Sequence, residues 1–201
     1  MKQILIMIAA VVLQGCGKQV PAQQAKVQDA KPTTQPPVAE IKRPPAIPKA
    51  ELTEAKLTPG MIAAKKAHEA GNYLEAARFC SMELAAEEAK PAPSWVQLSY
   101  LYNELGRALN NAGLYDKALE HHQKSLAIVL KQLGPEHPIA SFNYNNIGLV
   151  HHNKAEYDKA LENYQKALEI AKEIGDKSSE GIFLGNIGRT LCLQRNYEQS
   201  I

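Results

Sequence analysis

The sequence lacks an apolar stretch long enough to cross a membrane as a helix. Its longest apolar run, residues 4–13, is about half of the ~20 residues that a bilayer requires. Aromatic residues are scarce, and the first one in the chain is Tyr73, so the preceding region has the composition of a segment without a core. Neither sign of charge predominates. The formal net charge is only +2, so the chain lacks the basic surface that is typical of nucleic-acid-binding proteins.

Catalytic motifs are absent as well. There is no Gly-x-Ser-x-Gly elbow, phosphate loop, Cys-x-x-Cys or His-Glu-x-x-His run. The glycines at 181, 185 and 188 do not match the dinucleotide pattern, because they open no strand-turn-helix unit. We therefore expect no enzyme activity, no cofactor and no small-molecule substrate.

The amino terminus resembles a bacterial lipoprotein signal. Met1-Lys2-Gln3 precedes the apolar run, which ends in Leu13-Gln-Gly-Cys16. In such signals the chain is cut before the cysteine, and that cysteine is lipidated. The resemblance predicts a signal peptide over residues 1–15 and a lipid on Cys16, with a transmembrane anchor as the alternative. It implies a bacterial cell envelope protein that faces the periplasm, and Gly17 after the cysteine slightly favours the outer membrane.

Residues 16–56 have the composition of a disordered linker. They are rich in Pro, Ala, Gln and Lys and include the pairs Pro36-Pro37 and Pro44-Pro45. Most of their charges are positive, which leaves two interpretations: a solvated tether or a contact with acidic lipid headgroups. We expect a flexible tether that holds the rest of the chain away from the membrane.

A short signature recurs four times in the remaining sequence, at Gly71–Ala76, Gly113–Ala118, Ala155–Ala160 and Arg195–Ser200. The first three copies are 42 residues apart and the fourth follows after 40. A second motif, an aliphatic residue followed by glycine, recurs with the same period. Its glycine lies twelve residues before the last residue of a copy, at Leu105-Gly106, Ile147-Gly148 and Ile187-Gly188. Repetition of this kind indicates an array whose units stack on their neighbours and present a surface for binding.

Each unit is predicted to contain two helices. In the third unit, apolar residues from Ile139 to Leu168 recur at spacings of three, four and seven, which line one helix face, interrupted by a turn over residues 153–156. Thr58, before Pro59, and Ser94 provide N-caps, while Gly134 and Gly175 follow helix ends. Small residues at Gly148 and Ala160 should let the two helices approach closely, and a large side chain at either position should separate them.

These positions resemble the tetratricopeptide repeat. The best match runs from Tyr144 through Ile147-Gly148 to Tyr157 and Ala160, and the loop Leu133–Pro138 is similar to the kinesin light chain type of repeat. The resemblance implies an all-α, right-handed superhelical solenoid of antiparallel helix pairs over residues 57–201. Its expected units are 57–93, 94–136, 137–176 and an incomplete 177–201; the first departs from the pattern at Ala63-Ala64.

The resemblance also implies a groove lined by the first helix of each unit. The side chains at the matching positions are mostly asparagines, with two arginines and a histidine: Asn103, Arg107, Asn110, Asn111, Asn145, Asn146, His152, Asn153, Asn186 and Arg189. An asparagine amide carries both donors and an acceptor, so a row of them suits the main chain of an extended peptide. The arginines would add a preference for acidic side chains. A solvated polar face is the alternative. The lysines of a carboxylate clamp are missing, since the comparable positions hold Asn103, Arg107, Asn146, Ile182 and Asn186.

Cysteines and histidines suggest no further chemistry. Cys80 and Cys192 are expected on helices several units apart, beyond the ~7 Å that a disulfide allows, so we predict two partly buried thiols without a bridge. The pairs His121-His122 and His151-His152 have no acidic or cysteine ligand at a metal spacing. We expect no metal site; His122 and His151 should instead pack between helices, and His137 should cap the helix that follows it.

The sequence leaves three functions open. The first is a membrane-anchored scaffold that binds an extended segment of a protein partner in its groove. In the second, the chain is the amino-terminal targeting arm of a longer protein with an enzymatic or signalling domain beyond residue 201; in the third, it has a structural role in envelope assembly. The incomplete fourth unit, with few residues after Tyr197, favours a chain that continues or pairs with another molecule.

Overall fold

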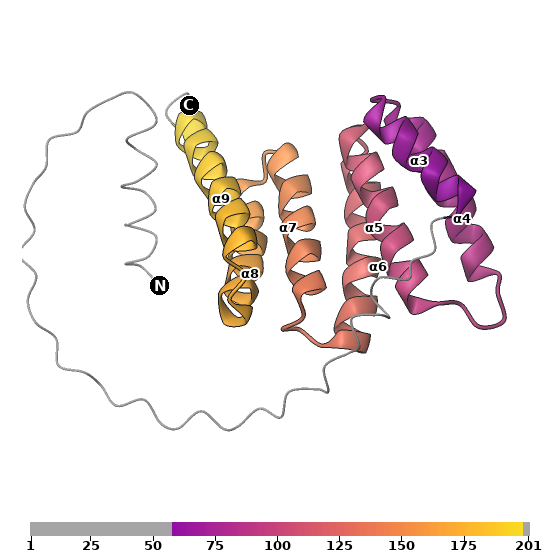
Figure 1. The fold of residues 1–201 in the computed structure, drawn as a ribbon. Coiled ribbons are helices and arrows are strands. Elements are labelled where there is room, and N and C mark those ends of the chain that lie inside the picture. The colour runs from indigo at the N-terminus through magenta and orange to yellow at the C-terminus, as the bar shows by residue number, and fades with distance from the viewer. Residues whose placement is uncertain (1–57, 199–201) are drawn as a thin grey trace, which may run out of the picture. The chain divides into compact units, whose positions relative to one another are not determined.

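The computed structural model describes residues 58–198, with side chains as far as Arg195, all within one compact unit, Ile47–Ile201. The predicted signal peptide, Cys16 and the linker lie outside the described residues. Every regular element in the described range is an α-helix (Figure 1). The helices are α3 (Pro59–Glu69), α4 (Tyr73–Glu88), α5 (Trp95–Asn111), α6 (Tyr115–Leu133), α7 (Pro138–Asn153), α8 (Tyr157–Ile174) and α9 (Lys177–Glu198).

The helices pack in the order of the chain. Three pairs, α3 with α4, α5 with α6 and α7 with α8, are each joined by a tight turn, and each pair packs against the first helix of the next. The first helices also meet one another, α5 against α7 and α7 against α9. This arrangement is the all-helical repeat array that the 42-residue spacing predicts.

Side chains mark the helix starts as expected. The hydroxyls of Thr58 and Ser94 accept hydrogen bonds from the backbone N–H groups of Met61 and Gln97, at 3.2 and 3.4 Å. His137 caps α7: its Nδ1 accepts from the backbone N–H of Ile139 at 3.2 Å. Each bond satisfies a backbone donor that the first turn of a helix leaves without an intrahelical partner.

The turn between paired helices depends on one left-handed residue. Gly71 and Gly113 have φ of 77°, and Ala155 occupies the third position with φ of 59°. Arg195 stands at the fourth, where a long side chain disfavours this conformation. There α9 continues without a turn through the fourth signature to Glu198. The prediction of a turn after the first helix of the fourth unit is therefore wrong for the described residues. The repeat spacing alone does not show that the residue at the left-handed position of this turn has changed to Arg195.

In two of the three pairs, α5 with α6 and α7 with α8, the helices meet where a glycine faces a ring; the first pair has Ala64 at the glycine position. A Cβ added to Gly148 would lie 2.7 Å from two carbons of the Tyr164 ring and 3.2 Å from the carbonyl oxygen of Ala160. In the preceding pair, a Cβ on Gly106 would lie 2.8 Å from the His122 ring. The expected close approach at Gly148 and Ala160 is confirmed, and His122 fills the ring position of its pair as predicted.

The buried ring of His122 brings a polar group into this contact. Only 1 % of the residue is exposed, and its Nδ1 has no hydrogen-bond partner among the described residues. Burial, with smaller contributions from Arg107 and His121, lowers the pKa of His122 to about 4. The ring is therefore neutral at neutral pH. Protonation as the pH falls from about 6.5 toward 4 favours the unfolded chain, so this contact is strongest above that range.

The core continues along the array through small and aliphatic side chains. Leu101, Leu105 and Ala108 of α5 are buried against α4 and α6, while Phe183 of α9 is fully buried. Asn143 occupies the position that Leu101 has in the preceding unit, is 2 % exposed, and leaves its Nδ2 without a partner among the described residues. None of the described helices is both long and apolar enough to span a membrane.

The contact at Gly148 yields a direct test. Gly148→Leu forces the Tyr164 ring away from α7, and overpacking of this kind costs about 1–3 kcal/mol. We expect urea unfolding, followed by circular dichroism, to show that loss. Gly181→Ala is the control, because no atom lies within 4 Å of the added Cβ. A helical glycine costs about 0.5–1 kcal/mol relative to alanine, so this variant should be slightly more stable than the wild-type protein. Equal stability of the Gly148→Leu variant and the wild-type protein would contradict the tight contact.

Candidate functional site

One face of α5, α7 and α9 carries half of the predicted groove residues. Along α9, Ile182, Asn186 and Arg189 recur at spacings of four and three, so they lie on the same side of the helix. Phe142 and Asn146 occupy the corresponding positions of α7. We call this surface the groove face and define it by the following residues: Tyr100, Asn103, Glu104, Arg107, Phe142, Asn146, Ile182, Asn186 and Arg189.

Asparagine amides link neighbouring units across this face. Asn146 Nδ2 donates to Asn103 Oδ1 at 2.9 Å, which joins α7 to α5. Two further pairs repeat the link: Asn153 donates to Asn110 at 2.9 Å, and Asn186 donates to Asn145 at 2.7 Å. The paired residues are 43, 43 and 41 positions apart, close to the repeat length. The asparagines therefore form a ladder that ties the first helices together.

The ladder changes what these amides can offer to a ligand. In the Asn103–Asn146 pair, Nδ2 of Asn103 and Oδ1 of Asn146 make no hydrogen bond within the described chain. One donor group and one acceptor group of this pair therefore stay available to a ligand. Asn145 is 7 % exposed and holds α7 to α9. Six predicted asparagines thus cross-link the units, while the surface left for a ligand is smaller than the sequence suggests.

The two predicted arginines differ in their surroundings. Arg107 Nη1 lies 2.8 and 3.0 Å from the two carboxylate oxygens of Glu104, one turn earlier on α5. Arg189 Nη2 donates to Asn186 Oδ1 at 2.9 Å and has no carboxylate partner within the described range. The charge of Arg107 is compensated, and that of Arg189 is not.

Two further contacts extend the ladder. His152 Nδ1 lies 2.8 Å from Thr190 Oγ1, whose hydroxyl donates to the Asn186 carbonyl, so His152 donates to Thr190. Burial and the nearby Arg189 lower the pKa of His152, which favours its neutral form. At the other end of the array, Asn111 Nδ2 lies 3.1 Å from His68 Nε2. Every neighbouring pair of first helices in the described array is thus bridged by polar side chains.

The comparison with protein families agrees with this architecture. A model described as the tetratricopeptide repeat matches residues 97–173 and 140–201, together more than half of the chain. The chain belongs to the tetratricopeptide repeat family. Repeats of this family are protein-interaction modules and are typically without enzymatic activity. No curated protein matches the sequence at a significant level.

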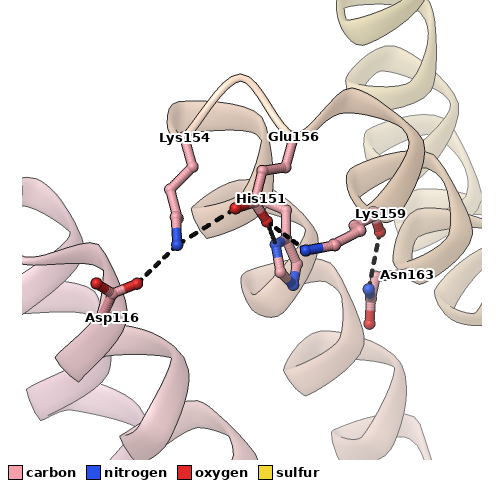
Figure 2. Close-up of polar contacts among 6 residues, drawn as sticks. All are labelled: Asp116, His151, Lys154, Glu156, Lys159 and Asn163. Atoms are coloured by element: carbon pink, nitrogen blue, oxygen red, sulfur yellow. Dashed lines mark hydrogen bonds and ion pairs between the residues drawn. The ribbon is translucent and has the colours of Figure 1, made fainter.

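Outside the groove face, a charged network joins two tetratricopeptide units at their turns (Figure 2). Lys154 Nζ lies 2.6 Å from Asp116 Oδ1 of α6 and 3.3 Å from Glu156 Oε1. Glu156 Oε2 also contacts Lys159 Nζ at 3.1 Å and His151 Nδ1 at 2.8 Å. Hydrogen bonds from Lys159, then His151, hold the pKa of the Glu156 carboxyl at about 2. His151 therefore has a polar role at the turn besides the packing role expected of it.

The cysteines and the other histidines form no site of their own. Cys80 is a buried thiol on α4, and burial raises its pKa to about 12, which keeps it protonated and unreactive. Cys192 is half-buried on α9, and four helices separate α9 from α4 along the chain. Within the described residues, no group of three or more His, Cys, Asp or Glu side chains is placed to hold a metal ion.

Sequence reasoning placed Ile182 at a groove position but missed the two aromatic residues of the groove face, Tyr100 and Phe142. Phe142, which the periodic pattern assigns to the buried stripe, is 45 % exposed, and Ile182 is 52 % exposed. Tyr100 is half-buried at the equivalent position of α5. These three residues each precede the glycine of their unit by six positions, at Gly106, Gly148 and Gly188. Alignment on these glycines, rather than on helical periodicity, would have found them.

The asparagine ladder predicts a measurable coupling between units. In a double-mutant cycle on Asn145→Ala and Asn186→Ala, we expect a coupling energy of about 1 kcal/mol, the usual net worth of a hydrogen bond between neutral groups. Urea unfolding of the four proteins measures it. The control cycle pairs Asn186→Ala with Asn163→Ala, because Asn163 bonds only within α8, to the Lys159 carbonyl at 2.8 Å. Additive losses in the first cycle would show that the bond does not stabilise the array.

Proposed function

We propose that this chain is a lipid-anchored scaffold of the bacterial cell envelope that binds an extended segment of a partner protein. The groove face is the observation that carries the binding half of this proposal. Polar and apolar side chains recur there on three successive first helices, and the ladder holds these helices at one spacing. A surface organised before binding loses less conformational freedom when a ligand orders on it.

An extended segment suits this surface better than a folded one. Its main chain carries donors and acceptors along its whole length, and the free halves of the asparagine amides, such as Asn103 Nδ2 and Asn146 Oδ1, match both. Arg189 adds a cation without a carboxylate partner in the described chain, which favours an acidic side chain in the segment. Arg107 contributes less to this preference, because Glu104 already neutralises it.

The anchoring half of the proposal rests on the amino-terminal sequence. The apolar run before Leu13-Gln-Gly-Cys16 has the length and position of a signal sequence, and Cys16 stands where lipid is attached. Two or more acyl chains give stable attachment where a single chain is marginal. The linker over residues 17–56 would then connect the anchor to the array and face the periplasm.

The groove is tested by a double variant, Asn146→Ala with Arg189→Ala. Loss of a hydrogen bond to a charged group costs about 1.5–3 kcal/mol, so we expect at least tenfold weaker retention of bound proteins. Bound proteins are identified by mass spectrometry after pull-down from detergent-solubilised envelopes. Asn163→Ala with Arg78→Ala is the control, since both residues lie on second helices. Equal capture by the two variants would exclude the groove face as the binding surface.

The anchor is tested separately by Cys16→Ser. Without the thiol no lipid is attached, and we expect the protein to move from the membrane fraction to the soluble fraction of the envelope. Fractionation followed by immunoblotting measures this, with Cys192→Ser as the matched control. A Cys16→Ser protein that remains with membranes would show that the attachment lies elsewhere.

A further inference from the structure

The first helix of a unit packs along one side against the second helix of the same unit. On α7 this side contains Tyr144, whose ring centroid lies 5.9 Å from Lys166 Nζ of α8, and Gly148, which faces the Tyr164 ring. Ser141 lies two turns before Gly148 on the same side and is 1 % exposed. The paired second helix therefore covers this side of α7.

The corresponding side of α9 has no second helix against it within the described residues. α9 lies at the end of the array and continues to Glu198 without a turn (Figure 1). An added Cβ at Gly181, the equivalent of Ser141, would meet no atom within 4 Å. Leu184 and Leu191 on this side are half-buried. We call this surface the end face and define it by the following residues: Gly181, Leu184, Gly188, Leu191 and Arg195.

The end face has the residue spacing of a seam between two helices. Its members recur at intervals of three, four, three and four, so they lie along one side of α9. Glycine alternates with leucine over the first four members. The glycines let a facing helix approach closely, and the leucines between them supply apolar surface for it to bury. Another helix is therefore the element that suits this side of α9.

The two leucines match each other when two copies of α9 run antiparallel. Leu184 lies four residues before Gly188, and Leu191 lies three residues after it. At 1.5 Å per residue these positions are about 6 and 4.5 Å from Gly188 along the helix axis. If the two helices cross at Gly188, Leu184 of each copy lies beside Leu191 of the other.

The charges that flank these leucines match in the same arrangement. Glu180 lies eight residues before Gly188 and Arg195 lies seven residues after it, so antiparallel helices bring them together. Oε1 of Glu180 accepts from Lys177 Nζ at 2.7 Å, whereas its Oε2 makes no hydrogen bond within the described residues. Arg195 is exposed and has no partner among the residues that the structure describes. In a parallel pair, Glu180 would instead face a second Glu180.

We propose that the end face binds the end face of a second copy of this chain, with the two α9 helices antiparallel about a two-fold axis near Gly188. A two-fold contact requires a surface that is complementary to itself. The matches of Leu184 with Leu191 and of Glu180 with Arg195 meet this requirement, and each occurs twice. The second α9 packs against the first as α8 packs against α7. This inference goes beyond the proposed function and does not depend on the groove face.

A further repeat unit fits the end of the array less well. Asn103 of α5 and Asn145 of α7 each accept a hydrogen bond from the first helix of the next unit, at 2.9 and 2.7 Å. α9 has Gly185 at this position, three residues before the glycine of its unit. The asparagine ladder therefore has no acceptor side chain there for another first helix. A second copy needs none, because its contacts lie on the end face.

Charge reversal tests the pairing on the full-length protein. Native mass spectrometry from detergent micelles counts the chains in each complex, and we expect the wild-type protein to be a dimer. Glu180→Lys places like charges together at both ends of the contact, so the ratio of dimer to monomer should fall at least tenfold. Glu162→Lys is the matched control, because it removes a similar lysine pair from α8, where Glu162 Oε1 lies 2.7 Å from Lys166 Nζ.

A double variant keeps this test independent of folding. Glu180→Lys with Arg195→Glu exchanges the two charges, so it should restore the dimer that Glu180→Lys alone loses. Circular dichroism should show equal helicity for all four proteins. A monomeric wild-type protein, or a dimer that is equally populated in Glu180→Lys and Glu162→Lys, would overturn the proposal. Partner capture by the groove face is a separate result, because none of these residues belongs to that face.

Disulfide formation tests the direction of the two helices. Leu184→Cys and Leu191→Cys are made separately, each with Cys192→Ser. In the antiparallel pair, identical positions are about 9 Å or more apart along the axis, beyond the ~7 Å that a disulfide allows. A mixture of the two variants should therefore give at least tenfold more cross-linked dimer on a non-reducing gel than either variant alone. Equal cross-linking of Leu184→Cys alone would indicate parallel helices and overturn the proposal.

Discussion

The close approach of paired helices at a glycine is the constraint on which the rest of this array depends. At Gly148 the Tyr164 ring lies directly against the α7 backbone, and at Gly106 the His122 ring takes the same place. Side chains of normal size at these glycines would push the pairs apart. Because each pair is tight, the turn that joins its helices has three residues and needs one left-handed position, which Ala155 fills in the third unit. The close spacing of these two pairs therefore follows from one kind of contact, and the first pair keeps the same three-residue turn with Ala64 at the glycine position.

Equivalent contacts between units are made at the same positions by residues of different chemical types. Lys154 reaches Asp116 at 2.6 Å to link the second and third units, and one repeat later Gln194 reaches Asp158 at 2.8 Å. In the first unit the position of Asp116 is taken by the apolar Leu74. An ion pair, a hydrogen bond from an amide to a carboxylate and an apolar side chain thus occupy the same place. Exposed polar links contribute little energy each, so the packing of the helices, which they share, sets the spacing.

Most of the fold could be predicted from the sequence, because repeat spacing and capping chemistry are local. The caps at Thr58 and His137 and the tight contact at Gly148 follow from single residues and their neighbours. The end of α9 could not be predicted in this way, since the fourth signature keeps its tyrosine while Arg195 removes the left-handed turn position. The repeat is detected from the motif as a whole, whereas the conformation of the turn depends on one of its residues, the one at the left-handed position.

The groove was harder to predict than the fold because its residues act in pairs from different units. The sequence shows Asn103 and Asn146 as two groove amides, but only the structure shows that a hydrogen bond joins them. Each such bond uses one donor and one acceptor, so the amide groups left over, such as Asn103 Nδ2 and Asn146 Oδ1, still include both kinds. Exposure of Phe142 depends likewise on the neighbouring α9, where Phe183 takes the buried place at an edge-to-face distance of 6.1 Å. Specificity in such an array is therefore a property of the interface between units, since a single repeat contains neither the amide pairs nor more than one of the apolar groove-face residues Tyr100, Phe142 and Ile182.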